Sequence, residues 1–161
     1  MVLLLYGGAA RAHLLTIGIG LLIASGNLYF GTVSMPVAAA WLAVVLSIVA
    51  WRQWNLARFR ATPRGVDDTR LWLGRFMPGP IASAFGWGLT ALVFMLDANL
   101  ELRIFTGIMV VGTVAGAVPI LGGSRRLFGA YSAVSIIPIA LVYILDPTGP
   151  LDPLLGMACL L

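Results

Sequence analysis

Long apolar runs alternate with short polar turns along almost the whole chain. About 20 helical residues rise far enough to cross a bilayer core of about 30 Å. The runs expected to be membrane spans cover residues 14–33, 37–51, 76–96, 102–121 and 127–145. The pattern predicts an all-α, polytopic transmembrane helical bundle with five full spans.

A sixth apolar run, PLLGMACLL, begins at Pro153 and ends with the sequence. About nine helical residues cover less than half of the hydrocarbon core. We therefore expect the start of a sixth span and a natural protein that continues beyond Leu161. On this interpretation residues 1–161 form a single transmembrane domain, the N-terminal part of a longer protein.

The composition agrees with a membrane protein. Hydrophobic residues make up 60% of the chain and charged residues 10%, and the mean hydropathy is +1.00. These values exclude an ordinary soluble domain. One cysteine, Cys159, and one histidine, His13, provide neither an internal disulfide nor a pair of imidazoles for a haem. No cofactor is expected.

The basic residues are all arginine, and they gather on one side of the expected topology. The segment between the second and third spans holds six of the ten, namely Arg52, Arg58, Arg60, Arg64, Arg70 and Arg75. Arg11, Arg125 and Arg126 fall on the same side, and only Arg103 falls on the other. Membrane proteins keep Arg in short cytoplasmic loops, so we expect a cytoplasmic N-terminus. The carboxylates that follow the third and fifth spans agree, since they fall on the opposite side: Asp97, Glu101, Asp146 and Asp152.

Two other interpretations of the arginines, nucleic-acid binding and a secretory signal peptide, fit the sequence less well than a role in membrane orientation. The arginines lie between apolar runs and form no solvated basic face, so nucleic acid is not an expected partner. Arg11 ahead of the first apolar run also fits a secretory signal peptide. That run is longer than the apolar region of a signal peptide, however, and no clear cleavage site ends it.

The sequence offers no catalytic constellation. No carboxylate falls within a span, and neither a nucleotide-binding glycine loop nor a metal-ligand spacing is present. We expect no catalytic residue and no metal site. Asn27 is a candidate ligand contact, because an amide in hydrocarbon needs an interhelical partner or water; a structural role is its alternative. Trp87 is a candidate ligand platform or, alternatively, a packing wedge.

Two glycine pairs predict close helix packing. Gly86 and Gly88 flank Trp87, and Gly112 and Gly116 are spaced four residues apart on one helical face. Small residues at such positions let the backbone of another helix approach closely. For Gly112 and Gly116, a contact within the chain and a contact with a second copy both remain open.

Four stretches carry a resemblance to a known group of proteins. They are Trp72 with Phe76, SAFGWGL at 83–89, VVGTVAGAV at 110–118, and Pro138 after the next aromatic run. Over about residues 71–150 the chain resembles the N-terminal membrane region of bacterial signalling proteins. In that group a multi-span sensor module, commonly of six helices, precedes a cytoplasmic GGDEF diguanylate cyclase or a histidine kinase. Ala84 departs from the pattern, because glycine is expected before the Trp-Gly pair.

This resemblance implies a function. The chain is expected to be a sensory input module in the bacterial inner (cytoplasmic) membrane, without enzymatic activity of its own. It would relay a signal through its last helix to a cytoplasmic diguanylate cyclase or kinase domain. Its expected partners are the lipid bilayer, an unidentified signal ligand and, in the full-length protein, a second copy that makes a homodimer.

A small transporter or channel-like membrane subunit is the alternative function. It would require intramembrane charges or broken helices near the bilayer midplane. No Asp, Glu, Lys or Arg falls in the middle of a span, whereas Pro78, Pro80 and Pro138 are candidate sites for breaks.

Overall fold

A computed structural model describes residues 9–61, 74–147 and 149–160. Its elements are α2 (Ala9–Tyr29), α3 (Met35–Ala61), α5 (Pro78–Phe94), α6 (Leu100–Leu121), α7 (Arg125–Leu145) and α8 (Asp152–Leu160). No strand occurs in these described ranges, so the all-α prediction is confirmed.

Four helices are long and apolar enough to cross a membrane, and they correspond to the second to fifth expected spans. They are Met35–Ala61, Gly74–Phe94, Leu100–Leu121 and Arg125–Leu145. The apolar part of α2, His13–Tyr29, is shorter than these. In its described part the chain is therefore a helical protein with four candidate membrane spans.

Helix α2 ends before its apolar run does. Gly31 has a φ of +72°, a left-handed conformation that glycine adopts without steric cost. The amide of Gly31 donates to the carbonyl of Leu28, and the amide of Thr32 to that of Asn27, both over 3.1 Å. These two bonds make a Schellman motif, which closes a helix. The expectation that the first span continues to residue 33 is therefore wrong, because hydropathy does not register this stop.

Helix α3 continues well past the apolar run that predicted it. It ends at Ala61, so the start of the expected basic loop is helical. Leu56 and Phe59 give this extension a buried side. On its exposed side the guanidinium of Arg58 stacks over the ring of Trp54, at 4.1 Å from the ring centroid. Arginine and leucine are good helix formers, and the packing of the buried side stabilises the extension. The helix therefore continues beyond its apolar run.

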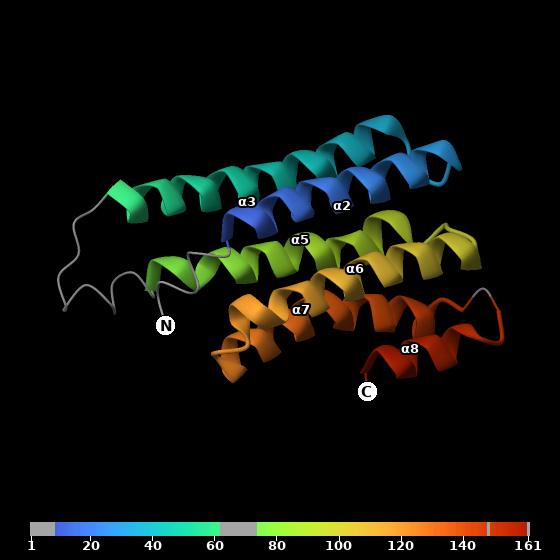
Figure 1. The fold of residues 1–161 in the computed structure, drawn as a ribbon. Coiled ribbons are helices and arrows are strands. Elements are labelled where there is room, and N and C mark those ends of the chain that lie inside the picture. Colours follow the sequence, from blue (N-terminus) through green and yellow to red (C-terminus); the bar gives the residue numbers. More distant parts are fainter. Residues whose placement is uncertain (1–8, 62–73, 148, 161) are drawn as a thin grey trace.

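Consecutive helices form antiparallel hairpins that pack side by side (Figure 1). In this bundle α5 contacts α3, α6 and α7, while α2 contacts α3 and α6. The last helix, α8, folds back against α7.

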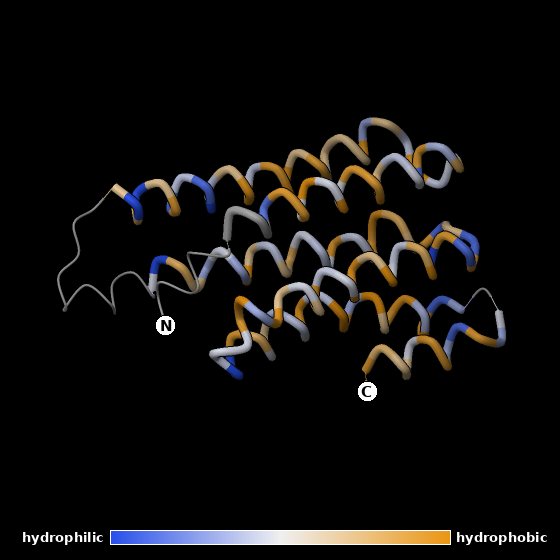
Figure 2. Tube along the Cα trace, viewed as in Figure 1, coloured by the Kyte–Doolittle hydropathy of each residue, from blue (hydrophilic) through white to orange (hydrophobic). Residues whose placement is uncertain are grey.

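The bundle has two polar ends. The C-terminus of α3 and the N-terminus of α7 lie at the same end of the bundle, which we call the basic end and which carries Arg58, Arg60, Arg125 and Arg126. The opposite, or far, end holds the turns before α3, α6 and α8. Figure 2 shows the most hydrophilic segments at these two ends and apolar segments between them. This arrangement is typical of a bundle whose middle lies in hydrocarbon.

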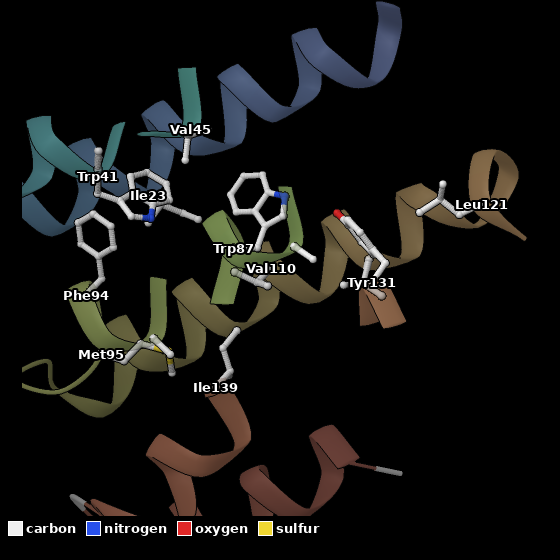
Figure 3. Packing of buried hydrophobic residues seen from close by; sticks show 14 of the residues in the cluster. Ile23, Trp41, Val45, Trp87, Phe94, Met95, Val110, Leu121, Tyr131 and Ile139 are labelled. Carbon is white, nitrogen blue, oxygen red and sulfur yellow. The ribbon is translucent and has the colours of Figure 1, made fainter. Parts of the chain in front are cut away.

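Aromatic side chains from α3 and α5 form the centre of the core (Figure 3). The ring centroid of Trp41 lies 5.0 Å from that of Phe94 in an edge-to-face arrangement, and 6.2 Å from that of Trp87. The indole nitrogen of Trp41 donates to the carbonyl of Gly86 over 3.1 Å. All three rings are buried, so Trp41 joins α3 to α5 by both packing and a hydrogen bond.

Two glycines permit close backbone contacts with α7. A Cβ atom at Gly88 of α5 would lie 2.5 Å from the carbonyl oxygen of Val134. A Cβ atom at Gly156 of α8 would lie 2.6 Å from Cγ1 of Ile144 and 2.9 Å from the carbonyl oxygen of Ala140. No larger residue fits at either position unless a helix moves.

Candidate functional site

A buried arginine organises the far end of the bundle. The Arg103 side chain is fully buried. Its Nε donates to the carbonyl of Ala98 over 3.1 Å, and its Nη2 donates to the carbonyl of Leu96 over 2.8 Å. Nη2 also bonds Oδ2 of Asp146 at 2.7 Å, and Nη1 donates to the Asp146 carbonyl. Oδ2 of Asp152, also fully buried, lies 3.7 Å from Nη1.

These contacts, which we call the Arg103 junction, join four parts of the chain. Arg103 belongs to α6, Leu96 and Ala98 to the turn before it, Asp146 to the end of α7, and Asp152 to the start of α8. A buried charge is stable only when it is paired and hydrogen-bonded, so the junction fixes these four parts relative to one another.

In the sequence, Arg103 stands out only as the one arginine on the opposite side. The sequence does contain a signal for this ion pairing, because Asp146 and Asp152 flank a turn that is expected on the same side of the membrane as Arg103. Pairing them with Arg103 requires knowing that the start of α6 lies beside the α7–α8 turn, which hydropathy does not encode.

A small cavity lies between the helices toward the basic end. Its volume is about 90 Å³, and α2, α3, α5, α6 and α7 all contribute to its wall. The wall includes Arg52 and three residues that carry hydroxyls, Thr16, Thr113 and Tyr131. In Figure 3 the Tyr131 hydroxyl points toward Trp87. We call this space the Arg52 cavity.

Arg52 is held in place by α5. Its Nη1 donates to Oγ of Ser83 over 2.8 Å, and Ser83 in turn donates to the carbonyl of Gly79 over 3.1 Å. A Cβ at Gly79 would lie 3.1 Å from Cγ of Arg52, so glycine makes room for the arginine stem. None of the carboxylates in the described residues forms an ion pair with Arg52.

A second, smaller hollow borders Arg52 on another side. It has a volume of about 20 Å³, and its lining includes His13, Asn55, Arg75 and Gly79. The described carboxylates all belong to the far end, namely Asp97, Glu101, Asp146 and Asp152. Within the described residues, the surroundings of Arg52 therefore contain a second arginine, Arg75, and hydroxyls but no carboxylate.

The candidate ligand residue Asn27 lines neither of these spaces. Its side chain is fully buried. The amide nitrogen donates to the carbonyl of Ile23 over 3.0 Å and to Oγ1 of Thr106 over 3.5 Å, while Oδ1 accepts from Thr32 over 2.9 Å. These partners satisfy the amide and link α2 to α6, which favours the structural interpretation.

Trp87 is likewise enclosed by protein. Its side chain is 2% exposed and packs near Trp41. This burial favours the packing wedge over a ligand platform.

The two glycine pairs differ in their surroundings. Gly88 contacts α7, and a Cβ at Gly86 would meet Val45 and Ile48 of α3 at 3.6 Å. Nothing in the described structure lies within 4 Å of a Cβ built at Gly112 or Gly116. Among the described residues, no helix therefore packs closely against this second pair, which instead borders the Arg52 cavity. Contact with a second copy stays a prediction.

The arginines that predicted the topology also have different surroundings. Arg58, Arg60, Arg75, Arg125 and Arg126 are exposed near the basic end, whereas Arg52 faces the cavity. Arg64 and Arg70 lie outside the described residues.

Comparison with protein-family models, curated proteins and solved structures finds no match. Among the described residues, no group of three or more His, Cys, Asp or Glu side chains is placed to hold a metal ion.

Proposed function

We propose that this chain is the sensory input module of a bacterial signal-transduction protein, embedded in the inner membrane. In this proposal α2 is a fifth span, the N-terminus is cytoplasmic, and α8 begins the helix that carries the signal to a cytoplasmic diguanylate cyclase or histidine kinase domain. The chain itself performs no catalysis.

The observation that carries the proposal is the Arg103 junction. A signal passes through a helical bundle only if it favours one of two arrangements of the helices. The junction ties the starts of α6 and α8 to the end of α7 through one guanidinium. A displacement of α6 against α7 would therefore be transmitted to α8.

The same junction supports the orientation. The only described arginine at the far end is buried and paired with Asp146, whereas the exposed arginines lie toward the basic end. A basic end in the cytoplasm agrees with the distribution of Arg in membrane proteins.

The transporter-like alternative receives less support. A transporter site commonly uses interrupted helices near the midplane. In the described residues α7 continues through Pro138, and the turn at Met77 that precedes Pro78 lies near the start of the span Gly74–Phe94, away from the midplane.

Two experiments test the sensor proposal. The first reads the coding sequence beyond Leu161, which should continue α8 into a cytoplasmic signalling domain, with GGDEF first and histidine kinase second. A stop codon directly after Leu161, or further membrane spans, would favour the transporter-like alternative.

The second experiment uses the full-length protein. Asp146→Asn should change the output activity at an unchanged protein level, because it weakens the junction. Asp97→Asn is the matched control, since Asp97 is an exposed carboxylate at the same end. Equal output from both variants and wild type would exclude the junction as the route of the signal.

A further inference from the structure

We propose that the Arg52 cavity binds the headgroup phosphate of an anionic phospholipid from the leaflet at the basic end. This inference concerns binding alone and does not depend on a sensory function.

The charge around Arg52 favours an anion. Among the described residues its guanidinium donates to the neutral hydroxyl of Ser83 and forms no ion pair with a carboxylate. A second arginine, Arg75, lines the adjacent hollow. A guanidinium in a low-dielectric site interacts strongly with an anion, and its fork of N–H donors matches the oxygens of a phosphate.

The depth of Arg52 in the membrane suits a headgroup. Arg52 lies 17 residues after Met35, the first residue of α3, which is a rise of about 26 Å. In a hydrocarbon core of about 30 Å that starts near Met35, Arg52 is close to the opposite edge. Phosphate headgroups of the leaflet at the basic end lie just beyond this edge.

The cavity has the size and the access that a headgroup needs. About 90 Å³ equals the liquid volume of about three water molecules, enough for a phosphate group but not for a whole lipid. Gly112 and Gly116 border the cavity on an exposed side of α6, with nothing described within 4 Å of their Cβ positions. This side is an opening through which an acyl chain can reach the surrounding lipid.

The basic surroundings also select among lipids. Basic pockets between membrane helices on the cytoplasmic side recognise anionic lipid headgroups. A zwitterionic lipid brings its own cation to a site that is already basic, so the cavity should prefer phosphatidylglycerol to phosphatidylcholine.

Native mass spectrometry tests the binding. The protein is purified in detergent with equal amounts of phosphatidylglycerol and phosphatidylcholine, and retained lipids are counted. Wild type should keep one phosphatidylglycerol per chain, and Arg52→Gln should lower its occupancy about tenfold. Arg126→Gln, which removes an exposed arginine toward the same end, should keep wild-type occupancy. Equal retention by Arg52→Gln and wild type, or equal loss in both variants, overturns the proposal.

Two further variants separate lipid binding from a purely structural role of Arg52. Gly116→Leu should also lose the lipid, because it fills the opening while Arg52 and Ser83 stay intact. Arg52→Lys should keep more of the lipid than Arg52→Gln, because it retains a cation on the cavity wall although it loses the planar fork of N–H donors. Wild-type retention by Gly116→Leu contradicts the assigned opening and with it the proposed site.

Free phosphate and the carboxylates of fatty acids also carry anionic oxygens that a guanidinium can bind. Inorganic phosphate at millimolar concentration, or oleate at a concentration equal to that of the phospholipid, should leave phosphatidylglycerol bound. Displacement by either would assign the cavity to that ligand and overturn the phospholipid.

Discussion

Nη2 of Arg103 lies 2.7 Å from Oδ2 of Asp146, which follows it by 43 residues. The arginine is fully buried, whereas the side chain of Asp146 is 51% exposed. The pair therefore lies at the edge of the bundle, where the cation is enclosed by protein and its partner still reaches water.

Replacing this arginine should weaken the whole far end. Arg103→Met takes the nearby cation from the fully buried Asp152 and removes donors from several carbonyls. Breaking a buried ion pair costs about 3–5 kcal/mol, and we expect the lower part of this range because Asp146 is half exposed. Thermal unfolding in detergent measures the loss.

The companion change Asp152→Asn should recover part of this stability, because it removes the buried negative charge that lies 3.7 Å from Nη1 of Arg103 in the wild type. If the stability lost in the double variant equals the sum of the losses in the two single variants, Arg103 and Asp152 are energetically independent.

Gly88 and Gly116 should respond in opposite ways to the same substitution. Gly88→Ala puts a Cβ 2.5 Å from the carbonyl oxygen of Val134, so α5 and α7 must separate and the melting temperature should fall. Gly116→Ala meets open space and gains up to about 1 kcal/mol of helix propensity, so the melting temperature should stay or rise. A drop with Gly116→Ala as large as with Gly88→Ala would mean that Gly116 lies at a contact, such as one with a second copy.

Much of the fold is predictable because hydropathy directly encodes a helix that lies in lipid. The all-α class and the second to fifth apolar runs follow from it. The end of α2 does not, since Gly31 stops the helix inside an apolar run through its φ angle. The extension of α3 to Ala61 does not either, because Leu56 and Phe59 stabilise it by tertiary contacts.

The candidate site is harder to predict, because it depends on which helices are neighbours. The sequence marks Asn27 as an amide that needs partners, and Thr32 and Thr106 provide them. It marks Arg52 as an orientation signal, yet the side chain also faces a cavity formed by residues from five helices. Spacing along the sequence carries no information about such a wall.

Asn27→Ala should reveal a structural role. It removes the bonds to Thr106 and Thr32, and interhelical hydrogen bonds in membrane proteins contribute about 0.6 kcal/mol on average and up to about 1.7. We expect a destabilisation of this size in detergent unfolding. Ser25→Ala is the matched control, because the exposed Ser25 bonds the Leu22 carbonyl of its own helix. Equal stability of both variants and wild type would argue against the structural interpretation.

The membrane orientation can be read from cysteine labelling. In a Cys159→Ala background, a cysteine at Asp97 should react with a membrane-impermeant maleimide added from outside, and a cysteine at Gly123 should react only after the membrane is opened. Both positions are exposed in turns at opposite ends of the bundle. A difference in their labelling therefore reports the side of the membrane on which each turn lies. The reverse pattern would place the basic end outside.

The contact between α7 and α8 can be followed with the native cysteine. Gly156→Ala forces a Cβ to within 2.6 Å of Ile144 and 2.9 Å of the Ala140 carbonyl oxygen, so α8 should move away from α7. Cys159 lies in α8 and is partly buried, and its reaction with N-ethylmaleimide in detergent should therefore become faster. Gly129→Ala provides the control, because Gly129 of α7 is exposed and has open space at its Cβ position. An unchanged rate in Gly156→Ala would mean that the α7–α8 contact has room for the methyl group and that the helices do not separate. A contact this loose would not transmit a displacement of α7 to α8.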